Sequence, residues 1–202
     1  MKRYENDEER SLAMAFAMLH RSDGRKAGER CLETLRKTLE YELTTIEALT
    51  TAALLAMSIT TQVVQTRPVV DTLFDEEVPS MDRIVAISRR MLEAMLDHDP
   101  KDAEEHPFEK SVRSLILQSN MEKIRTCAKA VLTEVLSIKG EWEFETDIAA
   151  LVKTVKYILA TFPGTSEQRR AVVNAVVKES SKMVKFMLEE SMNVERGASG
   201  VN

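Results

Sequence analysis

Hydrophobic residues recur with a helical period along most of the chain, and the pattern is most complete from Leu43 to Gln65. Within this stretch only Glu47 is charged, and alanines and threonines occupy most of the remaining positions. The apolar positions with helical spacing are Ile46, Leu49, Ala53, Met57 and Val64. A helix that is apolar or small on nearly every side is usually surrounded by other helices. The pattern therefore predicts an all-α, multi-helix bundle of about seven or eight helices, with residues 43–65 as its central helix.

Two amphipathic patterns precede the central stretch. The first begins after Asn6, which forms a capping-box motif with Glu9, and ends at Ser22-Asp23-Gly24. The second starts near Arg25 and continues into the central stretch, so residues 25–66 form either one long helix or two helices that break near Thr44-Thr45. The predicted inner faces are Leu12, Phe16 and Leu19 in the first pattern, and Leu32, Leu35, Leu39 and Leu43 in the second.

The second half of the chain predicts further helices joined by short connections. After Arg67-Pro68, residues 67–79 form an acidic connection that either crosses the bundle or docks as an arm on a neighbouring subunit. The predicted helix starts are the Ser80 cap, Pro107 at a first helical position, and the capping boxes Ser119/Glu122 and Thr165/Gln168. Residues 1–192 are predicted to form one helical domain, with a two-lobe split near 67–79 as the alternative, and residues 193–202 a disordered tail.

Composition and charge narrow the class of protein. The chain has 202 residues and a net charge of −5. Residues 71–105 contain 11 acidic and 4 basic side chains, a net of −7, which leaves the rest of the chain at about +2. This asymmetry is suited to attraction between copies of the chain, or to a basic face for an anionic partner. Eleven methionines are consistent with adaptable apolar packing.

The two cysteines and the N-terminus predict an intracellular, reducing compartment, cytoplasmic or nuclear. Cys31 and Cys127 lie far apart in helical patterns, as expected for buried structural thiols rather than a disulfide. The first residues are charged and lack the apolar region of a secretion signal. Glu47 and the many threonines of the central stretch argue against an integral membrane protein.

The sequence lacks the motifs of common enzyme and metal sites. It contains no GxGxxG, Walker, GxSxG or CxxC motif. The acidic and histidine-containing stretch 97–106 has neither HExxH nor EF-hand spacing. We therefore expect no catalytic residue, no metal and no cofactor, and predict a protein that is not an enzyme.

The first functional hypothesis is a non-enzymatic helical structural or interaction protein that forms a homo-oligomer or docks a protein partner. The apolar side chains of the 67–79 connection and a heptad-like seam in residues 144–162 support protein–protein interaction. The predicted interface residues are Val69, Val70, Leu73, Phe74, Phe144, Leu151, Val155 and Ile158.

The alternative hypothesis is a nucleic-acid-binding helical protein, such as an RNA-binding coat, matrix-type or regulatory protein. Basic side chains gather on the outer face of the last helix and at the start of the second pattern, where they are spaced to contact phosphates. The candidate residues are Lys178, Lys182, Lys185, Arg21, Arg25, Lys26, Arg30, Arg36 and Lys37. A second alternative is a ligand-binding bundle whose pocket lies between helices near the central threonines.

Overall fold

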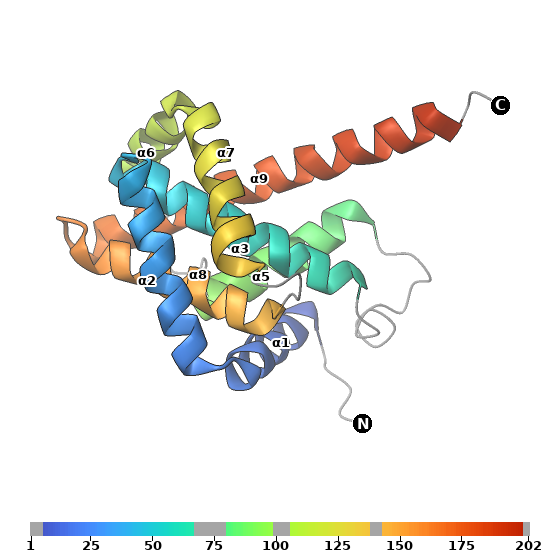
Figure 1. Ribbon diagram of the computed structural model, residues 1–202, viewed down its shortest axis with the longest axis horizontal. Helices are drawn as coiled ribbons and strands as arrows, with labels where there is room; N and C mark the ends of the chain where they lie inside the picture. The colour runs from blue at the N-terminus through green and yellow to red at the C-terminus, as the bar shows by residue number, and fades with distance from the viewer. Residues whose placement is uncertain (1–5, 67–79, 99–105, 138–142, 200–202) are drawn as a thin grey trace.

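The computed structural model describes residues 6–66, 80–98, 106–137 and 143–199, and side chains as far as Ser191. Throughout these ranges the secondary structure is helical, which confirms the predicted all-α fold (Figure 1). The helices are α1 Asp7–Arg21, α2 Gly24–Glu40, α3 Thr45–Thr66, α5 Met81–Met95, α6 Pro107–Gln118, α7 Met121–Ala130, the π-helix η2 Val131–Leu136, α8 Phe144–Thr161 and α9 Ser166–Ser199. Residues 67–79, which carry the predicted arm and lobe boundary, lie outside the described ranges.

The central helix is α3, as the hydrophobic pattern predicts. It packs mainly against α8, α9 and α5, with α7 and α6 covering its remaining sides (Figure 1). Ala52, Ala53 and Ala56 are fully buried, and these small side chains let neighbouring helices approach closely. The hydroxyls of Thr51 and Thr61 donate to backbone carbonyls four residues earlier in α3, so these two buried hydroxyl donors are satisfied.

α3 is also the one helix in the described ranges that has the length and composition to cross a membrane. In this structure, however, 83% of its most apolar 18-residue window is buried against other parts of the chain. This burial is what a core helix requires, because its apolar surface is covered by neighbouring helices rather than by lipid.

Residues 25–66 form two helices, not one. α2 ends at Glu40, and Glu42 adopts a positive φ of 50° that a continuing helix excludes. Thr44 and Glu47 then form a reciprocal capping box: the Glu47 N–H donates to Thr44 Oγ1 at 3.3 Å, and the Thr44 N–H donates to Glu47 Oε2 at 2.9 Å. This T-x-x-E motif is a sequence signal for the break.

The other predicted helix ends agree with the structure in most cases. The side chains of Asn6 and Ser80 cap α1 and α5, Pro107 opens α6, and Thr165 and Gln168 form a capping box at the start of α9. Asn120 rather than Ser119 caps α7, because its Oδ1 accepts the Lys123 N–H at 3.1 Å.

Two helices in the second half of the chain differ from their predicted form. The helix expected over residues 120–139 changes from α to π geometry at Val131. α9 continues to Ser199 instead of ending near Met192, since the sequence offers no proline to stop it. Its C-terminal end projects past the other helices (Figure 1).

The predicted inner faces of α1 and α2 are wrong for most of their residues. α1 buries Ser11, Ala15 and Met18, and α2 buries a largely polar face. Leu35 and Leu43 pack partly against the core as predicted. The other five predicted residues are exposed: Leu12, Phe16, Leu19, Leu32 and Leu39. Small residues on the buried face of α1 allow it to pack closely on α5 and α8.

Glu47 connects the starts of two helices, α3 and α7, which makes it a sensitive test of this architecture. Besides capping α3, its Oε1 accepts the Asn120 N–H at 3.1 Å, which fixes the start of α7 to the start of α3. Burial acts to raise the pKa of Glu47, but the N–H groups of Thr44 and Asn120 stabilise the carboxylate, and the pKa is lowered from its usual 4.5.

Replacing Glu47 with Gln is expected to lower the free energy of unfolding by about 1–3 kcal/mol at neutral pH, because hydrogen bonds to a charged acceptor are lost. Since the folded-state pKa is depressed, the advantage of the wild type is complete above the unfolded pKa and is lost as the pH falls through the folded pKa. Urea unfolding at several pH values measures this difference. The matched control is Glu122→Gln, an exposed glutamate on α7; equal effects of the two substitutions would contradict the role of Glu47.

Candidate interaction surfaces

The first candidate surface is an apolar stripe on the outside of α1. Leu12, Phe16 and Leu19 are spaced four and three residues apart, so they share one face of the helix. All three are exposed, and Phe16 is 68% exposed. We call these three residues the α1 stripe. An aromatic and two leucines in line on a surface helix form the pattern that an amphipathic helix uses to contact another protein.

The second candidate surface is a leucine stripe on the outside of α2. Leu32 is 68% exposed and Leu39 is 76% exposed, with the half-buried Leu35 between them. We call these three residues the α2 stripe. Their spacing of three and four residues is that of one helix face. An amphipathic helix usually packs its apolar face against the core. The exposure of the α2 stripe therefore requires a specific cause on the opposite side of α2.

That cause is a buried ion pair between α2 and α8. The Arg30 guanidinium contacts the Asp147 carboxylate, and it also lies 3.5 Å from Glu143 Oε2. Asp147 is 0% exposed and Arg30 is also buried. Burial raises the pKa of Asp147 to about 6, although the charge of Arg30 favours the carboxylate. A buried charge is costly unless it is paired, so this pair fixes which face of α2 turns inward.

A second polar contact holds the far end of α2. Lys37 is buried, and its Nζ lies 2.5 Å from Glu134 of η2 and 3.2 Å from Glu40. The hydrogen bond to Glu134 raises the pKa of Lys37, so the amine is charged at neutral pH. Arg30 and Lys37 are seven residues apart and therefore lie on the same face of α2. Together they turn the α2 stripe toward solvent.

The basic residues predicted to bind nucleic acid are mostly engaged with carboxylates of the same chain. On α9, Lys178 Nζ lies 2.7 Å from the buried Glu109, Lys182 Nζ 2.8 Å from Glu179, and Lys185 Nζ 2.6 Å from Asp82. Arg21 is exposed at the end of α1. The remaining ion pairs are Arg25–Glu29, Lys26–Glu143, Arg30–Asp147, Arg36–Glu33 and Lys37–Glu134.

The predicted protein-interface residues divide into two groups. Leu151, Val155 and Ile158 are buried in the core, and Phe144 packs against it, so the heptad-like seam of α8 joins helices within one chain. The other four, Val69, Val70, Leu73 and Phe74, lie outside the described residues.

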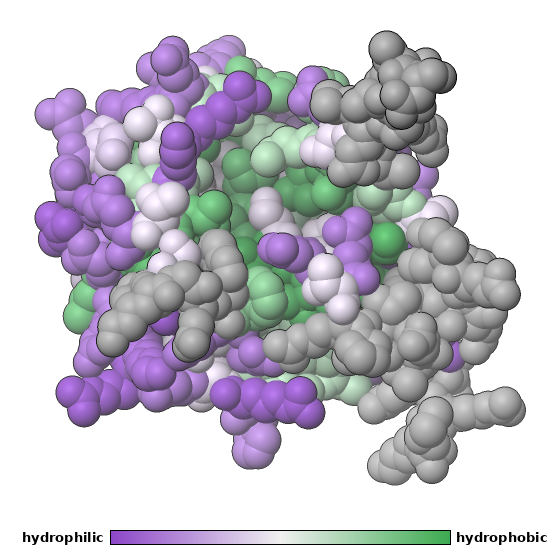
Figure 2. Space-filling model, turned by 45° about the vertical axis from the view of Figure 1, so that its right-hand side comes forward, coloured by the Kyte–Doolittle hydropathy of each residue, from purple (hydrophilic) through white to green (hydrophobic). Residues whose placement is uncertain are grey.

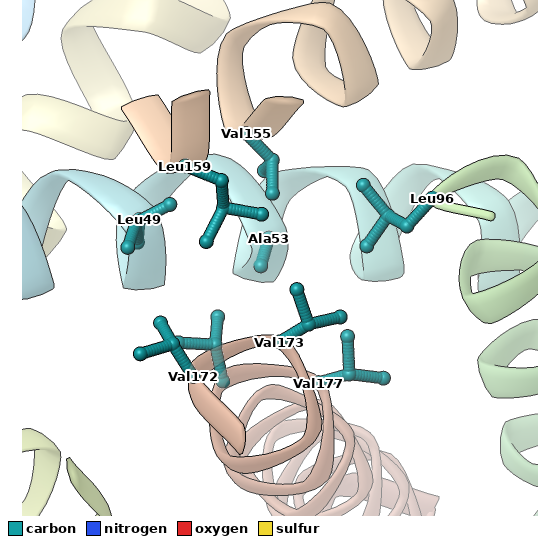
Figure 3. A pocket seen from close by; sticks show the side chains of 9 residues that line it. Leu49, Ala53, Leu96, Val155, Leu159, Val172, Val173 and Val177 are labelled. Atoms are coloured by element: carbon teal, nitrogen blue, oxygen red, sulfur yellow. The ribbon is translucent and has the colours of Figure 1, made fainter. Parts of the chain in front are cut away.

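The core next to the central helix has no room for a ligand. Leu49 and Ala53 of α3 face Val155 and Leu159 of α8 and the valines of α9 across a small apolar gap (Figure 3). The volume open to a water-sized sphere in this gap is about 0 Å³. The hydroxyls of Thr50, Thr51 and Thr61 all donate to backbone carbonyls within α3, so they line no ligand pocket there.

A larger groove lies between the C-terminal halves of α3 and α9, with a volume of about 320 Å³. Figure 2 brings the right-hand side of Figure 1 forward and shows hydrophobic side chains exposed between hydrophilic ones on this face. The groove is lined by Ser58, Thr61, Gln62 and Gln65 of α3 and by Val184, Met187, Leu188 and Ser191 of α9.

The two thiols are buried, as predicted. Burial raises the pKa of Cys127 to about 11, which keeps it a protonated thiol with little nucleophilic character at neutral pH. Within the described ranges, no three side chains among His, Cys, Asp and Glu are arranged to hold a metal ion. Neither protein-family models, nor curated proteins, nor solved structures gave a match to this chain.

Replacing Arg30 with Met is expected to lower the free energy of unfolding by about 3–5 kcal/mol at pH 8, because Asp147 is left buried without its main partner. The loss should be smaller at pH 5: a carboxyl whose folded pKa is raised destabilises the fold progressively as the pH rises above its unfolded pKa. The double variant Arg30→Met/Asp147→Leu removes both charges and should recover much of the loss.

Urea unfolding of both variants gives these values, and Arg25→Met, which changes an exposed arginine of α2, is the control. A single variant as stable as the control would mean that the ion pair does not orient α2.

Proposed function

We propose that this chain is a non-enzymatic helical structural or interaction protein that self-associates or docks protein partners through the α1 and α2 stripes. The observation that supports this function best is the outward orientation of the two stripes, which hold several large apolar side chains in helical register. An isolated exposed leucine needs no explanation, but a set of large apolar side chains aligned on each of two consecutive helices is typical of surfaces that contact protein.

The energetics of α2 favour a functional surface over chance exposure. Buried arginine, lysine and aspartate side chains hold α2 in its observed orientation. If α2 were rotated so that its leucines faced the core, each Å² of apolar surface buried would contribute about 25 cal/mol to stability. In the monomer the observed orientation leaves the apolar side chains of Leu32 and Leu39 in water. A partner that covers the leucines recovers the hydrophobic free energy on binding.

Nucleic-acid binding is less well supported by the geometry. Eight of the nine candidates lie beside a carboxylate of the same chain, which weakens the positive potential that a phosphate would meet. The ligand-binding alternative is also less well supported, because the gap beside Leu49 and Ala53 has no volume for a ligand. The groove between α3 and α9 has the volume, but the described residues that line it include no ionisable side chain.

Light scattering behind size exclusion tests the proposal. We expect a molar mass that stays well above the 22.8 kDa of one chain from about 0.1 M to about 1 M salt, because salt screens charges and not the apolar contacts of the two stripes. The absorbance ratio at 260 and 280 nm should be that of protein alone. A protein that elutes at 22.8 kDa would refute self-association, and co-eluting nucleic acid would favour the alternative.

Variants of the stripes locate the contact. Leu32→Glu/Leu39→Glu and Phe16→Glu should each weaken association by about tenfold or more, since a carboxylate in an apolar contact is desolvated without a partner. Leu117→Glu on α6 is the matched control, because Leu117 is as exposed as Leu32 but belongs to neither stripe. If the control and the stripe variants dissociate equally, the stripes are not the contact.

A further inference from the structure

From Lys182 to Glu190, α9 has a solvent-exposed side that the residues just before it lack. Residues 171–177 are buried, whereas Lys182, Phe186, Glu189 and Glu190 are exposed, with Phe186 at 58%. The other three lie three or four residues from Phe186, which places all four along one side of the helix. They lie from the middle of α9 onward, and the end of this helix projects past the other helices (Figure 1). We call these four residues the α9 stripe.

The order of charges in the α9 stripe is self-complementary. Lys182 lies four residues before Phe186, and Glu190 lies four residues after it. If a second copy of α9 runs antiparallel with a two-fold axis at Phe186, each Lys182 faces Glu190 of the other copy and the two phenylalanines meet at the axis. Interfaces of two-fold dimers have this property, because one patch must complement itself.

The ion pair that Lys182 already makes does not prevent this contact. Its partner Glu179 lies three residues earlier on the same helix, and the Lys182 side chain remains 59% exposed. Glu179 is buried and also accepts a hydrogen bond from Arg113 at 2.8 Å, so it keeps a cationic partner when the Lys182 amine faces a second carboxylate.

Two methionines beside Phe186 widen the apolar part of this contact. Met183 lies three residues before Phe186 and packs partly against the core, and Met187 is 50% exposed. Both lie at the edge of the α9 stripe, so a helix packed on Phe186 contacts them as well. The groove between α3 and α9 is separate from this contact, because its residues Val184 and Leu188 lie on the other side of α9.

We propose that a second copy of this chain packs its α9 antiparallel on the α9 stripe, with the two-fold axis at Phe186 and with Met183 and Met187 at the edge of the contact. This inference rests on the proposed self-association and assigns one of its contacts. The partner is another copy rather than a foreign protein, because the stripe complements itself in charge.

Reversing the charges tests the antiparallel pairing. Lys182→Glu alone places two carboxylates opposite each other at both ends of the contact, and Glu190→Lys alone places two amines there. Each variant should associate about tenfold more weakly than the wild type in sedimentation equilibrium at low salt. Mixing the two variants should restore association, because the carboxylates at positions 182 and 190 of one variant then face the amines at positions 190 and 182 of the other. The double variant Lys182→Glu/Glu190→Lys should also associate as the wild type does.

Lys129→Glu, an exposed lysine on α7, controls for the change in net charge and should have no effect. Circular dichroism establishes that each variant is folded. If the single variants keep the wild-type association constant, or if mixing does not restore it, the α9 pairing is wrong. That result would leave the proposed self-association through α1 and α2 to be tested by the variants of those two stripes. A wild type that is monomeric throughout overturns both.

Discussion

The contact between Arg30 and Asp147 decides how this chain presents its surface. Both side chains are buried, so each charge depends on the other to offset the cost of leaving water. This dependence fixes the rotation of α2 about its own axis, and Lys37 on the same face repeats the constraint one heptad later. Because the leucines lie on the other side of α2, the burial of its polar face puts Leu32 and Leu39 in solvent. The exposure of the α2 leucines is therefore a consequence of the buried charges on the opposite face of the helix.

The sequence predicts the fold well wherever hydrophobic pattern and capping chemistry agree. The central helix α3 was predictable because its apolar and small residues cover nearly every side. Helix starts at Asn6, Ser80 and Pro107 were predictable because each depends on one local hydrogen bond or one fixed dihedral angle. The Thr44/Glu47 box carried the same kind of signal for the break between α2 and α3.

The candidate surfaces were not predictable from the same pattern. α2 has a leucine face and a polar face, and the rule that apolar residues turn inward selects the leucines. The correct choice depends on Asp147, which lies 117 residues from Arg30 and shows its role only when α8 packs beside α2. A sequence pattern within α2 contains no trace of that partner. The same limit applies to the lysines of α9, whose partners Glu109 and Asp82 come from other helices.

The two ends of the chain thus differ in the chemistry they offer to a partner. The α1 and α2 stripes are apolar and should be indifferent to salt, whereas the α9 stripe combines Phe186 with charges and should respond to it. An assembly that uses both would have one contact set by hydrophobic burial and another whose geometry is set by charge order.

The central claim is that α2 turns its leucines outward, and thiol accessibility measures this directly. In a Leu39→Cys variant, diluted until the protein is monomeric, the new thiol should react with a disulfide reagent nearly as fast as in the unfolded chain. The native thiols Cys31 and Cys127 are buried and should be strongly protected. If the thiol at position 39 is protected and Cys31 reacts quickly, α2 is rotated with its leucines inward, which contradicts both the exposed α2 stripe and the buried ion pair that orients it.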